Sequence, residues 1–175
     1  MARLSYIDDA AKKSVKELAE RISAQRNGNL PNLFRMLLHS PNVAAGWFDF
    51  LSSIRKESIL DGRTREFVII YVAMLLRADY PINDHIPIAL KEGITQDEMD
   101  ALESWHTSSL FDQRDKALLA YVEESSENVQ VPDDVFEDLR RQYSDREVIE
   151  ITVLIGAYHL VARFLEALQI DLEPS

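Results

Sequence analysis

The 175-residue chain contains no cysteine, and this absence excludes several kinds of chemistry. Disulfides, Cys-ligated zinc and iron–sulfur clusters need cysteine sulfur, and thiol-based redox catalysis needs a cysteine nucleophile. Glycine and proline are also scarce, with 5 and 6 residues, which argues against a disordered or fibrous chain. The length and the hydrophobic content of 46% are typical of one globular domain. We therefore expect residues 1–175 to form a single domain whose chemistry uses no thiol.

Basic residues are outnumbered, with 19 Lys and Arg against 30 Asp and Glu and a formal net charge of -11. Such a surface repels the phosphates of nucleic acids and anionic lipids, so we expect neither nucleic acid nor a membrane as a partner. The longest uninterrupted apolar run, residues 67–76, is about half the length of a membrane span. Residues 1–11 lack the apolar stretch of a signal peptide. We expect a cytoplasmic protein that acts on a small-molecule substrate.

Hydrophobic periodicity predicts helices along nearly the whole chain. The predicted helices cover residues 8–25, 31–39, 43–55, 63–77, 80–93, 96–105, 112–125, 132–143 and 144–169. Thr95 to Glu98 and Ser144 to Glu147 have the spacing of capping boxes, and Gly93 is a typical residue just beyond a helix end. Pro87 predicts a kink or a late start in its helix. The expected fold class is all-α, a single-domain bundle of about eight helices.

Two ionisable residues beside the most apolar segment are candidates for acid–base chemistry. His85 lies early in its helix next to Asp84 and Asn83, and a polar helix junction suits a general acid or base. Glu66 opens the preceding helix, where it either stabilises the helix dipole at the surface or forms a partly buried carboxylate with a raised pKa. In a plain antiparallel hairpin the two residues would be offset by about 9 Å along the helix axis. A water, a substrate or a neighbouring subunit would then have to connect them.

The other histidines have simpler interpretations. His39 and His106 follow predicted helices, where a cation stabilises the helix dipole. His159 lies in the apolar final helix, as a core or interface residue would. The sequence contains no His-Glu-x-x-His pair, no phosphate-binding glycine loop and no Gly-x-Ser-x-Gly motif. We expect no metal and no cofactor, with a haem held by a histidine as an alternative that visible absorbance would reveal.

The segment from Arg65 to Thr95 resembles a known protein family. A glutamate opens an apolar helix, a tyrosine lies at the junction that follows, and then come a histidine and Ala-x-x-x-Gly. This order resembles the carboxymuconolactone decarboxylase-like family, which includes the alkylhydroperoxidase D proteins, and the resemblance extends over roughly residues 40–170. It implies an all-helical fold that usually forms oligomers, so we expect a homo-oligomer. It also implies that Glu66 and His85 are the functional glutamate and histidine of the family.

Two departures from the family pattern restrict what the resemblance implies. The peroxidase branch has a Cys-x-x-Cys pair just before the histidine, and the matching positions here are Ala78 and Pro81. Thiol peroxidase activity is therefore excluded. Decarboxylase-like members often carry an acidic residue and an aromatic residue after the junction tyrosine, where this chain has Pro81 and Ile82. We therefore expect a different substrate.

The leading hypothesis is a cofactor-independent enzyme, either a decarboxylase-like lyase or an isomerase. It would act on a small carboxylated lactone or keto acid by general acid–base catalysis. His85 would be the acid or base, Glu66 would tune it or relay protons, and Tyr80 would donate a hydrogen bond to developing oxyanion charge. Arg63 or Arg65 would pair with the substrate carboxylate, or both are ordinary surface charges. The alternative is a non-catalytic small-molecule-binding or assembly protein of the same fold.

Overall fold

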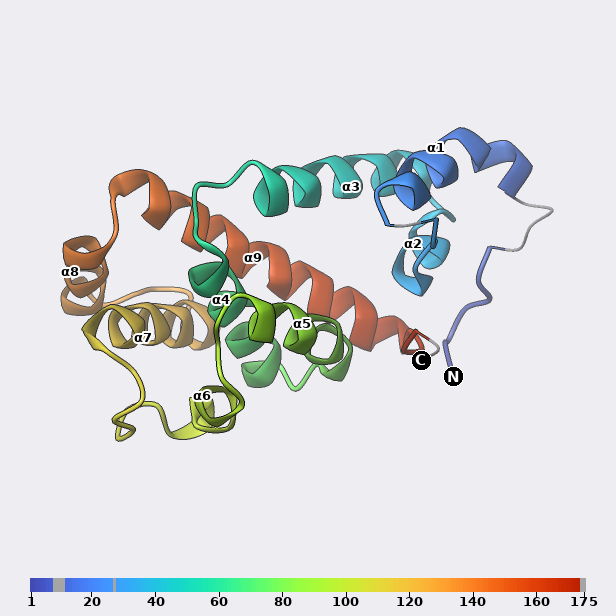
Figure 1. Cartoon of the computed structure of the whole chain (residues 1–175). Coiled ribbons are helices and arrows are strands. Elements are labelled where there is room, and N and C mark those ends of the chain that lie inside the picture. Colours follow the sequence, from blue (N-terminus) through green and yellow to red (C-terminus); the bar gives the residue numbers. More distant parts are fainter. Residues whose placement is uncertain (8–11, 27, 174–175) are drawn as a thin grey trace. The chain divides into compact units, whose positions relative to one another are not determined.

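The structure, a computed structural model, describes residues 1–7, 12–26 and 28–173 (Figure 1). In that part of the chain it contains nine α-helices, one 3-10 helix and no strand, which confirms the all-α prediction. The elements are α1 (Lys12–Ala24), α2 (Asn32–Leu37), α3 (Pro41–Lys56), α4 (Gly62–Leu75), α5 (Asp79–Lys91), α6 (Gln96–Asp100), η1 (Leu102–Ser104), α7 (Gln113–Glu127), α8 (Asp133–Gln142) and α9 (Asp145–Leu168). The start of the first predicted helix, residues 8–11, lies outside the described residues.

Two details differ from the sequence-based expectation. The predicted helix over residues 96–105 ends as an α-helix at Asp100 and continues as the 3-10 turn η1, a common form of a helix C-terminus. The helix that contains Pro87 does not start late, because α5 begins at Asp79 and continues through the proline. The capping box at Thr95 is present as predicted, with reciprocal hydrogen bonds to Glu98.

The chain divides into two compact units, residues 1–57 with 164–175 and residues 58–163. The expectation of a single domain stays a prediction. The core of the first unit is aromatic: Phe34 and Phe48 pack edge-to-face at 5.7 Å, and Trp47 packs on Phe164 at 5.3 Å between ring centroids. Aromatic pairs of this kind contribute about 0.5–1.5 kcal/mol beyond their buried area.

Helix α4 is the centre of the second unit and packs against α5 and α7 (Figure 1). Asp61 caps its N-terminus by accepting a hydrogen bond from the backbone N–H of Thr64 at 2.8 Å. From Glu66 to Ala73 every residue of α4 is buried, so the helix has no solvent face along this stretch. A glutamate at the start of such a helix is therefore carried into the core, where it needs hydrogen-bonding partners.

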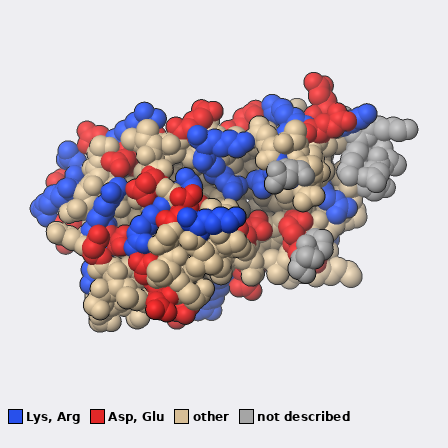
Figure 2. All heavy atoms as spheres, in the orientation of Figure 1, with Lys and Arg blue, Asp and Glu red and all other residues tan. Residues whose placement is uncertain are grey.

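Helix α9 is long and apolar enough to cross a membrane by length and composition, but half of its most apolar window is buried inside the protein. Core helices of soluble proteins have the same properties, so this is weak evidence for a span. Polar and charged residues interrupt the apolar residues of α9, so no uninterrupted apolar run marks this helix in the sequence. On the face in view, Figure 2 shows basic side chains interspersed with acidic ones.

Candidate active site

Glu66 and His85 meet directly in the core of the second unit. The Nδ1 atom of His85 lies 2.6 Å from Oε2 of Glu66, and the two residues are 5% and 1% exposed. The predicted offset of about 9 Å is wrong, and no bridging group is needed. Glu66 lies nine residues before the end of α4 and His85 six residues after the start of α5. The remaining axial offset of about 4.5 Å is one that two long side chains can span.

Tyr158 of α9 completes this cluster and was missed by the sequence analysis. Its hydroxyl lies 2.9 Å from Nε2 of His85, and the two rings pack edge-to-face at 5.3 Å. Tyr158 is 3% exposed. The two residues are 73 positions apart in the chain, so no local motif connects them. The one available signal was a tyrosine within an apolar helix, because a buried tyrosine usually finds a hydrogen-bond partner.

Glu66 is held in its ionised form. Burial alone would raise the pKa of this carboxyl, but the hydrogen bond from His85 and the nearby charges of His85 and Arg65 outweigh it and keep the pKa below its ordinary value. The raised pKa considered in the sequence analysis is thus in the wrong direction. Because an ionised carboxylate only accepts hydrogen bonds, Nδ1 of His85 carries a proton and donates a hydrogen bond to Glu66. The nitrogen left for proton exchange is Nε2, which faces Tyr158.

Arg65 supports the cluster from its solvent side. Its Nε donates to Oε1 of Glu66 at 3.1 Å, so the two oxygens of that carboxylate have different partners. Its Nη2 reaches outward to Oε1 of Glu92 at 3.5 Å. The Arg65 side chain is 19% exposed against 2% for Glu66. Arg65 therefore connects the buried pair with the surface.

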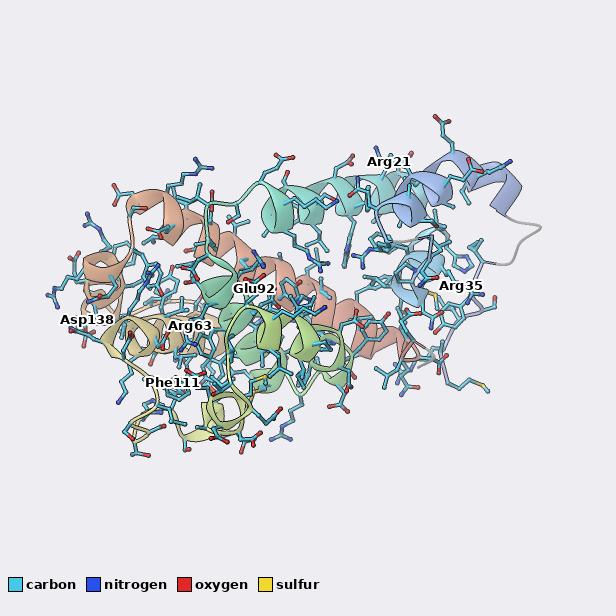
Figure 3. The ribbon with its side chains drawn as sticks, viewed as in Figure 1. Arg21, Arg35, Arg63, Glu92, Phe111 and Asp138 are labelled. Carbon is cyan, nitrogen blue, oxygen red and sulfur yellow. The ribbon has the colours of Figure 1, made fainter. Side chains whose placement is uncertain are left out.

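Arg63 has a different environment from Arg65. Its Nη2 donates to Glu98 at 2.6 Å and to Asp115 at 2.8 Å, and its guanidinium lies over the ring of Phe67. Both carboxylate residues are buried. Burial lowers the pKa of the guanidinium, but these hydrogen bonds and charges raise it overall, so the ion pairs persist at any ordinary pH. Asp115 lies in the first turn of α7, and Figure 3 shows the Arg63 label over this helix. Its role in substrate binding stays a prediction.

Tyr80 lies buried in the first turn of α5, five positions before His85. Its proposed hydrogen bond to an oxyanion stays a prediction. The two positions that match the cysteines of the peroxidase branch, Ala78 and Pro81, are both buried at this same helix start. Within the described ranges, no group of three His, Asp or Glu side chains is arranged to hold a metal ion.

Two of the three residues of this cluster lie in a segment that matches a known protein family. Residues 41–124 match the model of the carboxymuconolactone decarboxylase family, a segment that contains Glu66 and His85 but ends before Tyr158. The uncharacterized protein YnjA of Escherichia coli (strain K12) is 27% identical over 145 residues, which cover 82% of this chain and 74% of YnjA.

Solved structures share the fold at lower identity. The AhpD core of a peroxidase-related protein from Ralstonia eutropha JMP134 is 18% identical, with a TM-score of 0.82 over 98% of this chain and 92% of that one. The debrominase Bmp8 in its apo form is also 18% identical, with a TM-score of 0.79 over 98% and 92%. Residues 41–124, just under half of this chain, therefore resemble the carboxymuconolactone decarboxylase family, and the chain contains no cysteine.

Proposed function

We propose that the protein is a cofactor-independent acid–base enzyme, a lyase or isomerase, that acts on a small carboxylated keto acid or lactone. The observation that carries the proposal is the buried hydrogen-bond chain from Glu66 through His85 to Tyr158. A carboxylate that orients an imidazole, which in turn exchanges a proton with a hydroxyl, is a recurring arrangement for proton transfer. Buried groups with shifted pKa values are concentrated at functional sites.

Decarboxylation of a β-keto acid shows how the chain of groups would work. The bond between the α-carbon and the carboxylate breaks, carbon dioxide leaves, and the electron pair remains as an enolate. The hydroxyl of Tyr158 gives its proton to the α-carbon, and the resulting phenolate takes the Nε2 proton of the His85 imidazolium. Glu66 stabilises that imidazolium beforehand, and water returns a proton to His85 afterwards. Tyr80 keeps its proposed role as a hydrogen-bond donor to the enolate oxygen.

An isomerase would use the same groups in both directions. Tyr158 would accept a proton from the carbon acid while its own proton moves to Nε2 of neutral His85, and the return of that proton would complete the reaction. The fold alone does not choose between these reactions, because related structures include both a peroxidase-related protein and a debrominase. The absence of cysteine removes thiol peroxidase activity.

A panel of β-keto acids and carboxylated lactones tests the proposal, with carbon dioxide release and loss of substrate as readouts. We expect turnover by the wild type and a loss of about 100-fold or more in His85→Ala, the usual scale of general acid–base catalysis. The matched control is His106→Ala, which removes an exposed histidine. Circular dichroism establishes that each variant is folded. Equal turnover by His85→Ala and the wild type, or no turnover by the wild type, contradicts the proposal.

An assembly function is the second candidate, and a surface feature of α9 favours it. Ile149, Val153 and Leu160 are exposed at 63%, 39% and 46%, and their spacing places them along one side of the helix. We propose that a second copy of the chain covers this row. Light scattering should give more than the monomer mass of 20.1 kDa, and Leu160→Glu should shift the protein toward the monomer. A strictly monomeric wild type contradicts self-association.

A further inference from the structure

We propose that Arg65 is the receptor for the substrate carboxylate and that Glu92 occupies this receptor until the substrate arrives. The inference rests on the proposed function and adds to it the residue that selects the anionic end of the substrate. Glu92 then acts as a built-in competitor, which an incoming carboxylate has to displace.

The two candidate arginines differ in how firmly their existing partners hold them. Arg63 is bound by the buried carboxylates of Glu98 and Asp115 at 2.6 and 2.8 Å. A ligand that took Arg63 from them would leave two buried anions without a cation beside them, which is strongly unfavourable. The outward contact of Arg65 is longer, 3.5 Å, and its partner Glu92 has a side chain that is 39% exposed. The Arg65 side chain is only 19% exposed, but a single long contact to an exposed carboxylate contributes little, so Arg65 is the arginine whose partner a ligand can displace.

Gly62 shapes the place that the carboxylate of Glu92 occupies. A Cβ atom on Gly62 would lie 1.8 Å from Oε2 of Glu92, so any side chain at this position would collide with the carboxylate. Gly62 does not have a positive φ, so its backbone conformation does not require glycine. Because Gly62 has no side chain, the carboxylate of Glu92 can come close to the start of α4. The Glu92 carboxylate thus lies against Gly62 and within reach of Arg65, and Figure 3 shows Glu92 at the end of α5.

The receptor is linked to the carboxylate end of the proton relay through a single side chain. Nη2 of Arg65 faces Glu92, while Nε of the same guanidinium donates to Oε1 of Glu66. The other oxygen of Glu66 holds His85. A carboxylate that replaced Glu92 would therefore bind one side chain away from Glu66, the carboxylate end of the proton relay. This arrangement suits a small molecule that carries a carboxylate at one end and an uncharged carbonyl group at the other.

Binding of levulinate, a keto acid that does not readily lose carbon dioxide, tests the inference by calorimetry or NMR titration. The uncharged probe is its methyl ester. We expect Glu92→Gln to bind levulinate about twofold to fivefold more tightly than the wild type, because the competing anion is gone. Arg65→Gln should bind it at least tenfold more weakly, and the methyl ester should bind equally to wild type and Glu92→Gln. The matched control is Glu103→Gln, which removes an exposed negative charge elsewhere on the second unit.

Several outcomes overturn the inference. The first is an unchanged affinity of Glu92→Gln for levulinate. The second is an equal gain in levulinate affinity in Glu103→Gln, because such a gain would reflect net charge alone. Since Arg65→Gln also removes a partner of buried Glu66, its fold is checked by circular dichroism, and Arg65→Lys provides a second variant that should also weaken levulinate. Tighter binding in Glu92→Gln without turnover of any substrate would leave the receptor intact and refute the lyase. Turnover with the same KM in Glu92→Gln and wild type would support the lyase and refute the receptor.

Discussion

The Glu66→Gln substitution removes a buried negative charge and keeps nearly the same side-chain shape. In the wild type, Oε2 accepts from His85 at 2.6 Å and Oε1 accepts from Arg65 at 3.1 Å. Glutamine offers one acceptor oxygen and one N–H₂ group, so one of the two donors would face another donor. A buried donor without a partner costs about 1–3 kcal/mol, and breaking a buried ion pair costs about 3–5 kcal/mol. Arg65 keeps Glu92 as a partner, so we expect a loss of about 3 kcal/mol.

Tryptophan fluorescence makes this loss measurable in the unit that contains the site. The chain has 2 tryptophans, Trp47 in the first unit and Trp105 in the second. In a Trp47→Phe background, urea unfolding followed through Trp105 therefore reports on the second unit. A loss of about 3 kcal/mol corresponds to a fall in Tm of about 6–12 °C for a chain of this size. Glu103→Gln should change stability by less than about 0.5 kcal/mol.

The pH dependence gives an independent check on the ionised state of Glu66. Its pKa is lower in the folded protein than the ordinary value of 4.5, so its stabilising contribution is fully present above that pH. The contribution is lost as the pH falls through the folded-state pKa. The difference in stability between wild type and Glu66→Gln should therefore be constant near neutral pH and shrink below about pH 4.5. A difference under about 1 kcal/mol at pH 7, or one that grows on acidification, would refute the reasoning.

Three further predictions follow from other contacts. Arg63→Ala removes the cation from two buried carboxylates and should destabilise the second unit by about 3 kcal/mol, measured by the same urea titration. Gly62→Ala should push the Glu92 carboxylate away from α4, and NMR should show shifted side-chain signals for Glu92 with the fold retained. Burial, and then the charge of Arg163, lower the pKa of His159, so an NMR titration should give this histidine a midpoint below 6.5.

Much of the fold was predictable because local signals agreed with the tertiary structure. The capping box at Thr95 marks a helix start that the structure contains. Glu66 and His85 were predictable as a pair through the family resemblance, but their direct contact was not. It depends on α4 ending at Leu75, a difference of two residues from the predicted end that shifts the axial offset by several ångströms.

The rest of the site depends on contacts between distant parts of the chain. Nothing near Tyr158 in the sequence indicates that α9 brings it to His85, because the contact is made by helix packing across 73 positions. Arg63 and Arg65 look equivalent in the sequence, two positions apart at one helix start. Their environments differ because Arg63 faces carboxylates on α6 and α7, whereas Arg65 faces Glu66 and the exposed end of α5.

Deuterium incorporation from heavy water into the ketone product of a β-keto acid tests the proton relay most directly. The comparison is between wild type, Tyr158→Phe and Tyr121→Phe, because Tyr121 is also buried and its hydroxyl also bonds a residue of α9, Thr152, at 2.8 Å. The account predicts that Tyr158→Phe lowers the rate about 100-fold or more, while Tyr121→Phe stays near the wild type. Equal rates in Tyr158→Phe and the wild type would contradict proton transfer through Tyr158 and His85.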